Sequence, residues 1–399
     1  MKKKVLCFAF AVILILLSVP TFADTHAQNE EIKSAVVKYF NFKHSVLSNP
    51  AAKMNVHSAI EKESPFLSSD YAEKFETVME MTRMLKTSRD CDLSYKKYSV
   101  DCQFKKISIS KANAFVKVFV VEKINYNIDP SITSESGTTH NINLVLQNDR
   151  WVICGDSYEM DGVGDAYDQL KQQHATKQDR RSLILSSYQE LINKGISKSK
   201  SAGLYENDPN IVNEGTGTRS SHTYNPGQNS APVKYAHDYC RKDNPPPWHT
   251  YTGDCTNFIS IAINKIIPKD KTGSNKWYWD SRTDKTASWT SAQYFRQYIY
   301  KNNNSTSSNS GIYGKHDTAA NCSYGDIVQY ASKSNDTWTD GRPKTTHSSI
   351  VTKISNNELY VSMHSFGDED SPYRCDFPVA DMPYYADCII YLNIVRYYD

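Results

Sequence analysis

The chain has 399 residues, and 46 Lys and Arg stand against 44 Asp and Glu, which gives a formal net charge of +2. A chain of this length exceeds what one hydrophobic core usually organises, so two domains are expected. Positive and negative charges nearly balance, and no run of Lys and Arg occurs after residue 23. The charge therefore gives no reason to expect nucleic-acid binding.

Residues 1–23 have the layout of a secretory signal peptide. Three lysines precede an apolar stretch from Val5 to Val19, and Pro20 and Ala23 suit a processing site. Cleavage removes those lysines, so the formal charge becomes 2 − 3 = −1. The stretch is short for a membrane span. We therefore expect a secreted, extracellular or cell-wall-associated protein without a membrane span after signal removal. An uncleaved N-terminal anchor is the alternative.

Residues 24–164 predict an α+β accessory domain. Apolar residues recur near a 3.6 period over 30–48 and over 71–85, which predicts two amphipathic helices. From about residue 95 the period changes to 2, in QFKKISISKANAFVKVFVVEKINYNI, THNINLVLQND and RWVICGD, which predicts antiparallel strands. This succession resembles the nuclear-transport-factor-2-like, or cystatin-like, accessory domains of exported bacterial proteins. No cluster of titratable residues marks a site there, so a spacer or docking module is expected.

Residues 165–221 predict a connection between two domains. Helically spaced apolar residues over 165–197 indicate a bridging helix or helix pair. The following stretch is dense in Ser, Gly, Asn and Pro, which is typical of a linker. A second domain is expected over 222–399.

The cysteines restrict the disulfides without determining them. Eight cysteines remain once Cys7 leaves with the signal peptide. The local pairs Cys91 with Cys102 and Cys375 with Cys388 are the first to consider, but the connectivity cannot be deduced from sequence. If one cysteine is catalytic, at least one more must stay unpaired.

Cys255 is the candidate nucleophile. An apolar stripe begins directly after it, and Tyr251 to Asp254 have the chemistry of a turn and a helix cap, so the thiol is placed in the first turn of a helix. Backbone N–H groups and the positive dipole end at a helix start stabilise a thiolate and can bind an oxyanion. A cysteine that only forms a disulfide gains nothing from this position.

Two downstream strands each carry a histidine. THSSIVTKI opens with His347, and LYVSMHS carries His364 on its polar face. A two-residue turn at Ser355–Asn356 or at Asn356–Asn357 puts both histidines on one face of the hairpin, where one imidazole can orient the other. A three-residue loop would separate them.

The motifs GDCTNFIS, WYWDSRTDKTASWTSAQYFRQYI, GDIVQY and HSSIV together resemble the amidase domain of secreted Gram-positive proteins, of the papain-like cell-wall amidase and endopeptidase type. The resemblance covers about 222–397. It implies an α+β papain-like domain in which Cys255 is the nucleophile, His347 the general base and then acid, and His364 the group that orients His347. It further implies that an amide in peptidoglycan or a related peptide is cleaved without cofactor or metal.

Two positions depart from that family's pattern. Ile261 stands where a Gln is common, and Ile266–Ile267 where Gly-Gly is usual, which puts the substrate contacts in doubt. Four residues are candidates for substrate binding or support: Asp254, Tyr251, Asn257 and Trp289. Asp254 and Asn257 fit a cap or a helix surface. The aromatic run that includes Trp289 could line a groove but is more typical of a core.

The rival hypothesis is a noncatalytic cell-wall or surface binding protein that retains the hydrolase fold, with Cys255 oxidised with Cys240 or Cys322. Acyl transfer to an amine is a third use of the same residues. The sequence lacks H-E-x-x-H, G-x-S-x-G and phosphate-binding loop motifs, and its Cys and His spacings do not suit zinc. Oligomeric state is not determined by the sequence.

Overall fold

The structure is a computed structural model. It describes residues 22–48, 66–88, 92–158, 162–176, 178–201, 221–248, 250–251, 253–272, 275–303, 311–332, 344–364, 372–381 and 386–398. Helices and an antiparallel sheet make it an α+β protein, as predicted. Residues 1–21 of the expected signal peptide lie outside the described residues. Within the described ranges no helix is long and apolar enough to cross a membrane.

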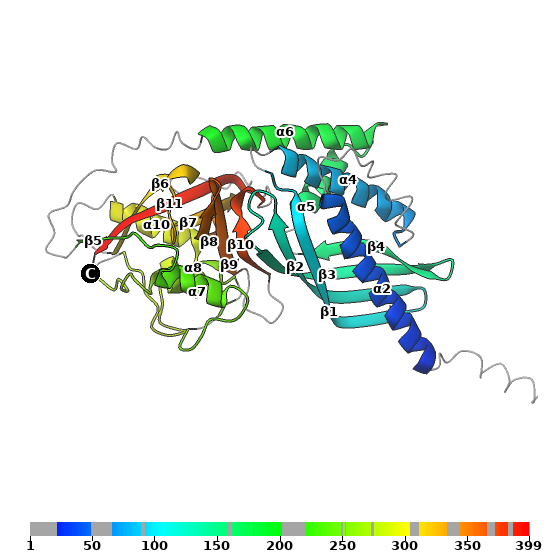
Figure 1. The fold of residues 1–399 in the computed structure, drawn as a ribbon, viewed down its shortest axis with the longest axis horizontal. Helices are drawn as coiled ribbons and strands as arrows, with labels where there is room; N and C mark the ends of the chain where they lie inside the picture. Colours follow the sequence, from blue (N-terminus) through cyan, green and yellow to red (C-terminus); the bar gives the residue numbers. More distant parts are fainter. Residues whose placement is uncertain are drawn as a thin grey trace, which may run out of the picture.

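The N-terminal unit is a helix pair over a four-stranded meander (Figure 1). Its elements are α2 (Phe22–Leu47), α4 (Ser69–Thr87), β1 (Tyr95–Ser110), β2 (Asn113–Tyr126), β3 (Ser134–Gln147) and β4 (Arg150–Tyr158). Apolar residues of both helices and all four strands share one core, with Phe40, Phe75 and Val118 among them. Both predicted helices and the predicted strands are confirmed.

Two bridging helices, α5 (Gly162–Gln173) and α6 (Arg180–Ser201), follow the meander. They pack on α4 through a separate apolar cluster that includes Met81, Leu170 and Tyr188. At its other end α6 contacts β11 of the C-terminal unit, so it connects the two units (Figure 1). The predicted helix pair is confirmed, while residues 202–220 of the predicted linker lie outside the described part of the chain.

The C-terminal unit places helices on one face of a sheet. Its helical elements are α7 (Ala231–Tyr239), α8 (Cys255–Ile263), α9 (Ala287–Thr290), α10 (Ala292–Asn303), η2 (Ala319–Asn321) and η3 (Val379–Asp381). Its strands are β5 (Ser221–Thr223), β6 (Gly311–Asp317), β7 (Ile327–Ser332), β8 (Thr345–Ser355), β9 (Glu358–His364), β10 (Tyr373–Pro378) and β11 (Ala386–Tyr398).

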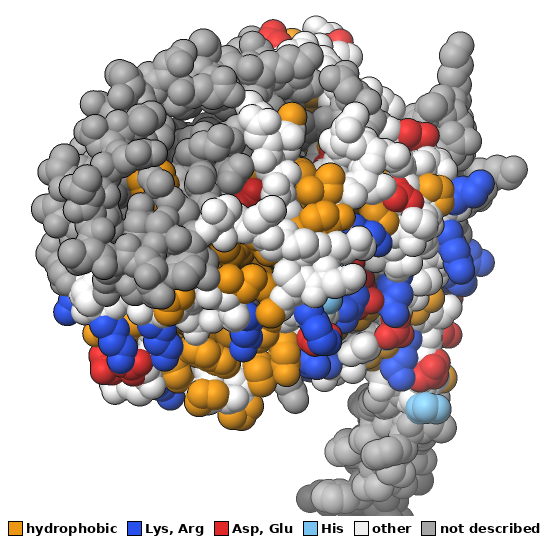
Figure 2. All heavy atoms as spheres, turned by 60° about the vertical axis from the view of Figure 1, so that its left-hand side comes forward, with side chains coloured by type: hydrophobic (Ala, Val, Ile, Leu, Met, Phe, Trp, Pro, Cys, Tyr) orange, Lys and Arg blue, Asp and Glu red, His pale blue; other side chains and the backbone are white. Residues whose placement is uncertain are grey.

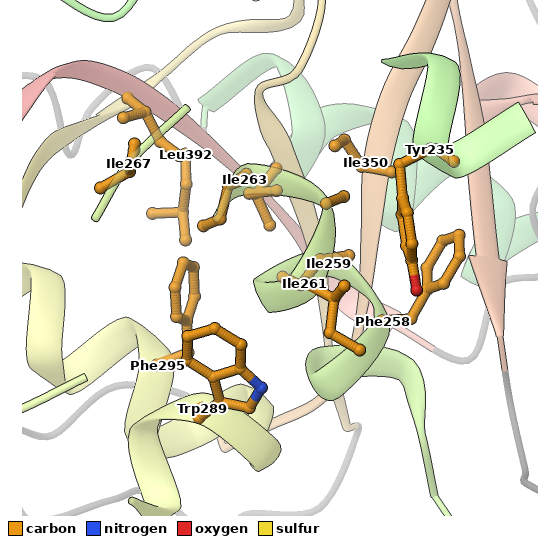
Figure 3. Packing of buried hydrophobic residues seen from close by; sticks show 14 of the residues in the cluster. Tyr235, Phe258, Ile259, Ile261, Ile263, Ile267, Trp289, Phe295, Ile350 and Leu392 are labelled. Atoms are coloured by element: carbon orange, nitrogen blue, oxygen red, sulfur yellow. The ribbon is translucent and has the colours of Figure 1, made fainter. Parts of the chain in front are cut away.

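Helix α8 is the centre of this unit's core, because every one of its residues is buried. Apolar side chains surround it on all sides, from α7, α9, α10 and the sheet (Figure 3). Ile261 and Ile267, two of the positions that depart from the family pattern, are fully buried in this core. Their side chains therefore serve packing, and they do not contact substrate in this arrangement.

One sheet runs through both units in the order β1-β2-β3-β10-β9-β8-β7-β11-β5, with β4 beside β3 and β6 beside β11. The units join where β10 pairs antiparallel with β3, Tyr373 opposite Gly137. Gly137 has to be glycine for this approach, since a Cβ there would lie 2.4 Å from Cε1 of Tyr373 and 2.5 Å from Cζ of Phe119. The sheet thus crosses the predicted boundary between the accessory and C-terminal domains.

A disulfide joins Cys240, at the end of α7, to Cys375 in β10, with Cα atoms 5.9 Å apart. The predicted pair Cys375 with Cys388 is therefore wrong, because β10 runs past the end of α7 and presents Cys375 to it. Cys102, Cys154 and Cys255 are free thiols. The predicted pair of Cys91 with Cys102 is therefore also wrong, although Cys91 itself lies outside the described residues.

Replacing Cys240 and Cys375 together by Ala should lower the free energy of unfolding by about 2 to 4 kcal/mol, since the disulfide closes a long loop in the unfolded chain. Urea unfolding of the variant and of the parent protein measures the difference. Cys154→Ala is the control for loss of a cysteine outside the disulfide. An unfolding midpoint equal to that of the parent would contradict the pairing.

Candidate active site

Cys255 is the first residue of α8, as predicted, and its side chain is buried. Its Sγ lies 3.7 Å from Oγ1 of Thr256, and the backbone of Ser348 in β8 also hydrogen-bonds to it. Burial raises the pKa of the thiol above its ordinary value, and the hydrogen bonds from Thr256 and Ser348 offset only part of this effect. The expected thiolate stabilisation is therefore outweighed by burial in this arrangement.

The carboxylate of Asp254 organises the residues in front of α8. It is fully buried and accepts from four N–H groups. Oδ1 accepts from the Tyr251 backbone (2.9 Å) and Asn257 Nδ2 (2.8 Å), and Oδ2 from Asn244 Nδ2 (2.8 Å) and His364 Nδ1 (3.0 Å). A buried carboxylate needs such donors to offset its desolvation. Asp254 is the N-cap residue of α8, which confirms one of the two predicted placements. Both Asp254 and Asn257 are buried, so the other predicted placement, on a helix surface, is wrong.

His364 has both ring nitrogens engaged. Nδ1 faces Oδ2 of Asp254, and Nε2 lies 2.6 Å from the carbonyl oxygen of Tyr239 at the end of α7. Each ring nitrogen thus faces an oxygen atom of another residue, and neither is left for a contact with His347. The ring also stacks on Phe258 of α8 at 4.2 Å. In this structure His364 anchors the start of α8 and does not orient His347, so that part of the prediction is wrong.

His347 and His364 lie on opposite faces of the sheet because of a β-bulge at Thr352. The hairpin turns at Asn356–Asn357, one of the two predicted turns, and both residues have positive φ. The pairing then shifts by one residue between Val351 and Lys353, which puts Ser348 opposite His364. The predicted shared face is therefore wrong.

The two faces of β8 have different neighbours. Ser348 Oγ lies 3.1 Å from Oγ1 of Thr256, so its face meets α8. On the other face, Nε2 of His347 contacts Sδ of Met363 at 2.7 Å, and the ring lies beside Tyr330. Helix α8, which begins with Cys255, thus packs against β8, but the side chain of His347 lies on the opposite face of that strand and does not contact the thiol.

Tryptophan side chains hydrogen-bond to two of the residues that donate to Asp254. Trp289 is fully buried, and its Nε1 donates to Oδ1 of Asn257 (2.9 Å). Trp279 Nε1 donates to the hydroxyl of Tyr251 (2.8 Å). Trp277 and Trp289 belong to the core cluster, so the core reading of these aromatics is the one that the packing supports.

The residues around Tyr251 combine aromatic rings with basic side chains. Nζ of Lys285 lies 5.0 Å from the Tyr251 ring, and Nζ of Lys269 lies 5.2 Å from the ring of Trp248. Figure 2 shows hydrophobic and basic side chains side by side on part of the face that it presents. Such a surface can stack against a sugar or a peptide while offering positive charge to it.

Sequence reasoning missed Asn244, Tyr239 and Ser348 as parts of this site. Asn244 and Tyr239 lie 11 and more residues before Cys255 in the chain, and no spacing rule connects them to it. One signal could have predicted such partners. If Asp254 is buried before the helix, its carboxyl group needs several N–H donors from other segments.

We expect Cys255 to react slowly in the resting protein. Below about pH 8, iodoacetamide should alkylate it at least about 10-fold more slowly than Cys154, because its thiol is buried and its pKa is raised. Peptide mapping after timed alkylation gives both rates, and Cys154 is the exposed internal reference. Unfolding in urea should equalise them. Faster labelling of Cys255 than of Cys154 in the folded protein would contradict the geometry.

His347 should weaken the fold in acid. Burial, together with the charge of Arg374, lowers its pKa to about 4, against about 6.5 in an unfolded chain. Between these values the unfolded state binds a proton that the folded state does not, so this residue costs stability as the pH falls through 6.5, and the loss is complete below about pH 4.

His347→Gln should therefore keep about 1 to 2 kcal/mol more of its pH 7.5 stability at pH 5 than the parent protein does. Urea unfolding of both proteins at the two pH values measures this difference. Parallel pH dependences would show that His347 is not shielded from protonation.

Comparisons with known proteins match parts of the chain. An uncharacterized protein, YjcM of Bacillus subtilis (strain 168), is 33% identical over 145 residues, which are 34% of this chain and 30% of that protein. The chain thus matches less than a third of that relative's length. No solved structure matches the chain significantly, so the papain-like and cystatin-like resemblances stay expectations. Residues 227–385, which contain Cys255, the Asp254 network and both histidines, match the family model described as "Putative amidase domain".

Proposed function

We propose that the chain is a secreted cysteine hydrolase that cleaves an amide bond, in peptidoglycan or a related peptide, with Cys255 as the nucleophile. One observation carries the proposal. The thiol lies at the start of a buried helix inside the region that matches the amidase family, and the backbone beside His347 hydrogen-bonds to it. A helix start supplies N–H groups for an oxyanion and a favourable field for a thiolate.

The reaction would run in two steps. Sγ of Cys255 bonds to the amide carbonyl carbon while its proton passes to His347, and the oxyanion is held by N–H groups at the helix start. His347 then gives the proton to the leaving amine as the C–N bond breaks. Water hydrolyses the thioester to a carboxylate and frees the thiol.

This chemistry requires the part of β8 that carries His347 to rearrange, so that the imidazole moves from Met363 on the far face of the sheet to the thiol. Its lowered pKa keeps the imidazole neutral at neutral pH, so a lone pair is available to take the proton. Its neighbour Ser348 already lies against α8, and catalytic hydrogen bonds often form only when substrate is bound. His364 and Asp254 would act as positioning residues that hold the helix start.

A noncatalytic wall-binding protein is the second candidate. It is favoured by the raised pKa of the Cys255 thiol and by the placement of His347 on the far face of β8. Its predicted oxidation of Cys255 with Cys240 or Cys322 is not seen, because Cys240 pairs with Cys375. Turnover separates the two candidates.

Cys255→Ala and His347→Ala should each lower the rate of amide cleavage by roughly 1,000-fold or more, because nucleophile and base act as a unit. The assay incubates residues 24–399 with purified peptidoglycan and follows new amino groups, with mass spectrometry of the released fragments. Cys322→Ala is the control, because it removes another buried cysteine and should retain full activity. Binding of peptidoglycan without any cleavage by the parent protein would support the wall-binding candidate instead.

A further inference from the structure

A charged cavity of about 160 Å³ lies inside the N-terminal unit, between α2, α4 and the sheet. The expectation that no titratable cluster marks a site in this unit is therefore wrong. Residues distant in the sequence supply the cluster, among them Lys43, His44, Glu122, His140 and Arg374. Arg374 comes from β10, so both units contribute to the lining.

The carboxylates of this cavity already have partners. Glu122 Oε1 lies 2.8 Å from His44 Nε2, and Asp156 Oδ1 lies 2.8 Å from His140 Nδ1. Burial alone would raise the pKa of Glu122, but its charge interaction and hydrogen bond with His44 lower it below the ordinary value. Asp381 pairs with Lys86. Each acidic group is thus satisfied as an anion, and none of them needs a ligand.

Two cations lack an acidic partner within the described residues. Arg374 is only 9% exposed, yet its guanidinium donates only to a hydroxyl and a backbone carbonyl, through Nη1, and its Nε has no partner. Lys43 is half-buried, lies over the ring of Tyr158 and is attracted by Glu122 and Asp156, although no described carboxylate is within salt-bridge distance of it. For Arg374, a buried guanidinium without a paired carboxylate is costly, and a guanidinium binds a carboxylate with two parallel hydrogen bonds.

His44 adds a further unsatisfied atom. Its Nε2 donates to the ionised Glu122, while Nδ1 is buried without a hydrogen-bond partner. This nitrogen has almost no accessible surface, so neither water nor a molecule in the cavity reaches it in this arrangement. The groups of the cavity that a polar ligand could complete are therefore its two cations.

We propose that this cavity binds a small organic acid through a single carboxylate, which Arg374 and Lys43 hold. The buried anions Glu122 and Asp156 nearby disfavour a doubly charged group such as phosphate. A cavity of this size holds roughly six to eight non-hydrogen atoms, by comparison with one of similar volume that holds benzene. The proposal does not depend on the activity proposed for Cys255.

The test measures binding of N-acetylglycine, as the probe acid, to the full mature chain by calorimetry. N-acetylglycinamide is the neutral probe, inorganic phosphate the doubly charged one, and acetyl-triglycine presents the same carboxylate on a longer peptide. We expect the small acid to bind at least about 10-fold more tightly than the amide, since a charge-assisted contact is lost in the amide. Phosphate should be weaker than the small acid.

Variants locate the binding. Arg374→Met keeps an unbranched side chain over the ring of Phe377 and should weaken N-acetylglycine binding by about 10-fold or more. Lys43→Met, on a different element, should weaken it in the same direction and serves if Arg374→Met does not fold. Lys123→Met removes an exposed cation outside the cavity and should leave the affinity unchanged.

Several results would overturn the proposal. They are equal affinity for acid and amide, tighter binding of phosphate, undiminished binding in both cavity variants, and no binding of N-acetylglycine at about 50 mM, a concentration that reveals very weak affinities. Binding of acetyl-triglycine as tight as that of the small acid would support a peptide terminus as the source of the carboxylate. Weaker binding of the longer peptide would support a free small acid.

Discussion

The C-terminal unit depends on satisfying the hydrogen bonds of one fully buried carboxyl group, that of Asp254. Four N–H groups from three segments have to converge on it, and each of them fixes the place of its own segment. The start of α8, and with it the Cys255 thiol, is thereby held against β9 and the end of α7. Loss of any donor would leave part of this buried group without a hydrogen bond, which is why this arrangement has little freedom.

The side chain of a single bulged residue decides which face of the sheet His347 occupies. The hydroxyl of Thr352 donates to Oδ1 of Asp376, and the same carboxylate oxygen contacts His237 of α7. Asp376 follows the disulfide residue Cys375 in β10, so the bulge, the disulfide and α7 are mechanically connected. Any rearrangement that brings His347 to the thiol has to alter this set of contacts or bypass it.

Arg374 connects the cavity of the N-terminal unit with the surroundings of His347 through the shared sheet. The pairing of β10 with β3 carries this residue from the C-terminal unit into the cavity of the N-terminal unit. In the other direction, Arg374 is opposite Met363, the residue that contacts His347, and its charge helps lower the pKa of that histidine. An acid bound at Arg374 would therefore act on the surroundings of His347 through one intervening side chain.

Local periodicity determined much of this protein by itself. The helices near 30–48 and 71–85, the long strands after residue 95 and the hairpin that carries both histidines follow from patterns of 3.6 and 2, because these elements bury one face each. The position of Cys255 at a helix start also follows, since the turn before it and the apolar run after it are local signals.

Only the tertiary structure decided the pairings between distant residues. The partner of Cys375, the donors of Asp254 and the convergence of Arg374, Lys43 and His44 depend on which segments meet, and no local pattern encodes that. The prediction of the sheet face on which His347 lies failed for a different reason. A strand's side chains alternate, so one bulged residue reverses every assignment beyond it, and the bulge at Thr352 is stabilised by an aspartate 24 residues away.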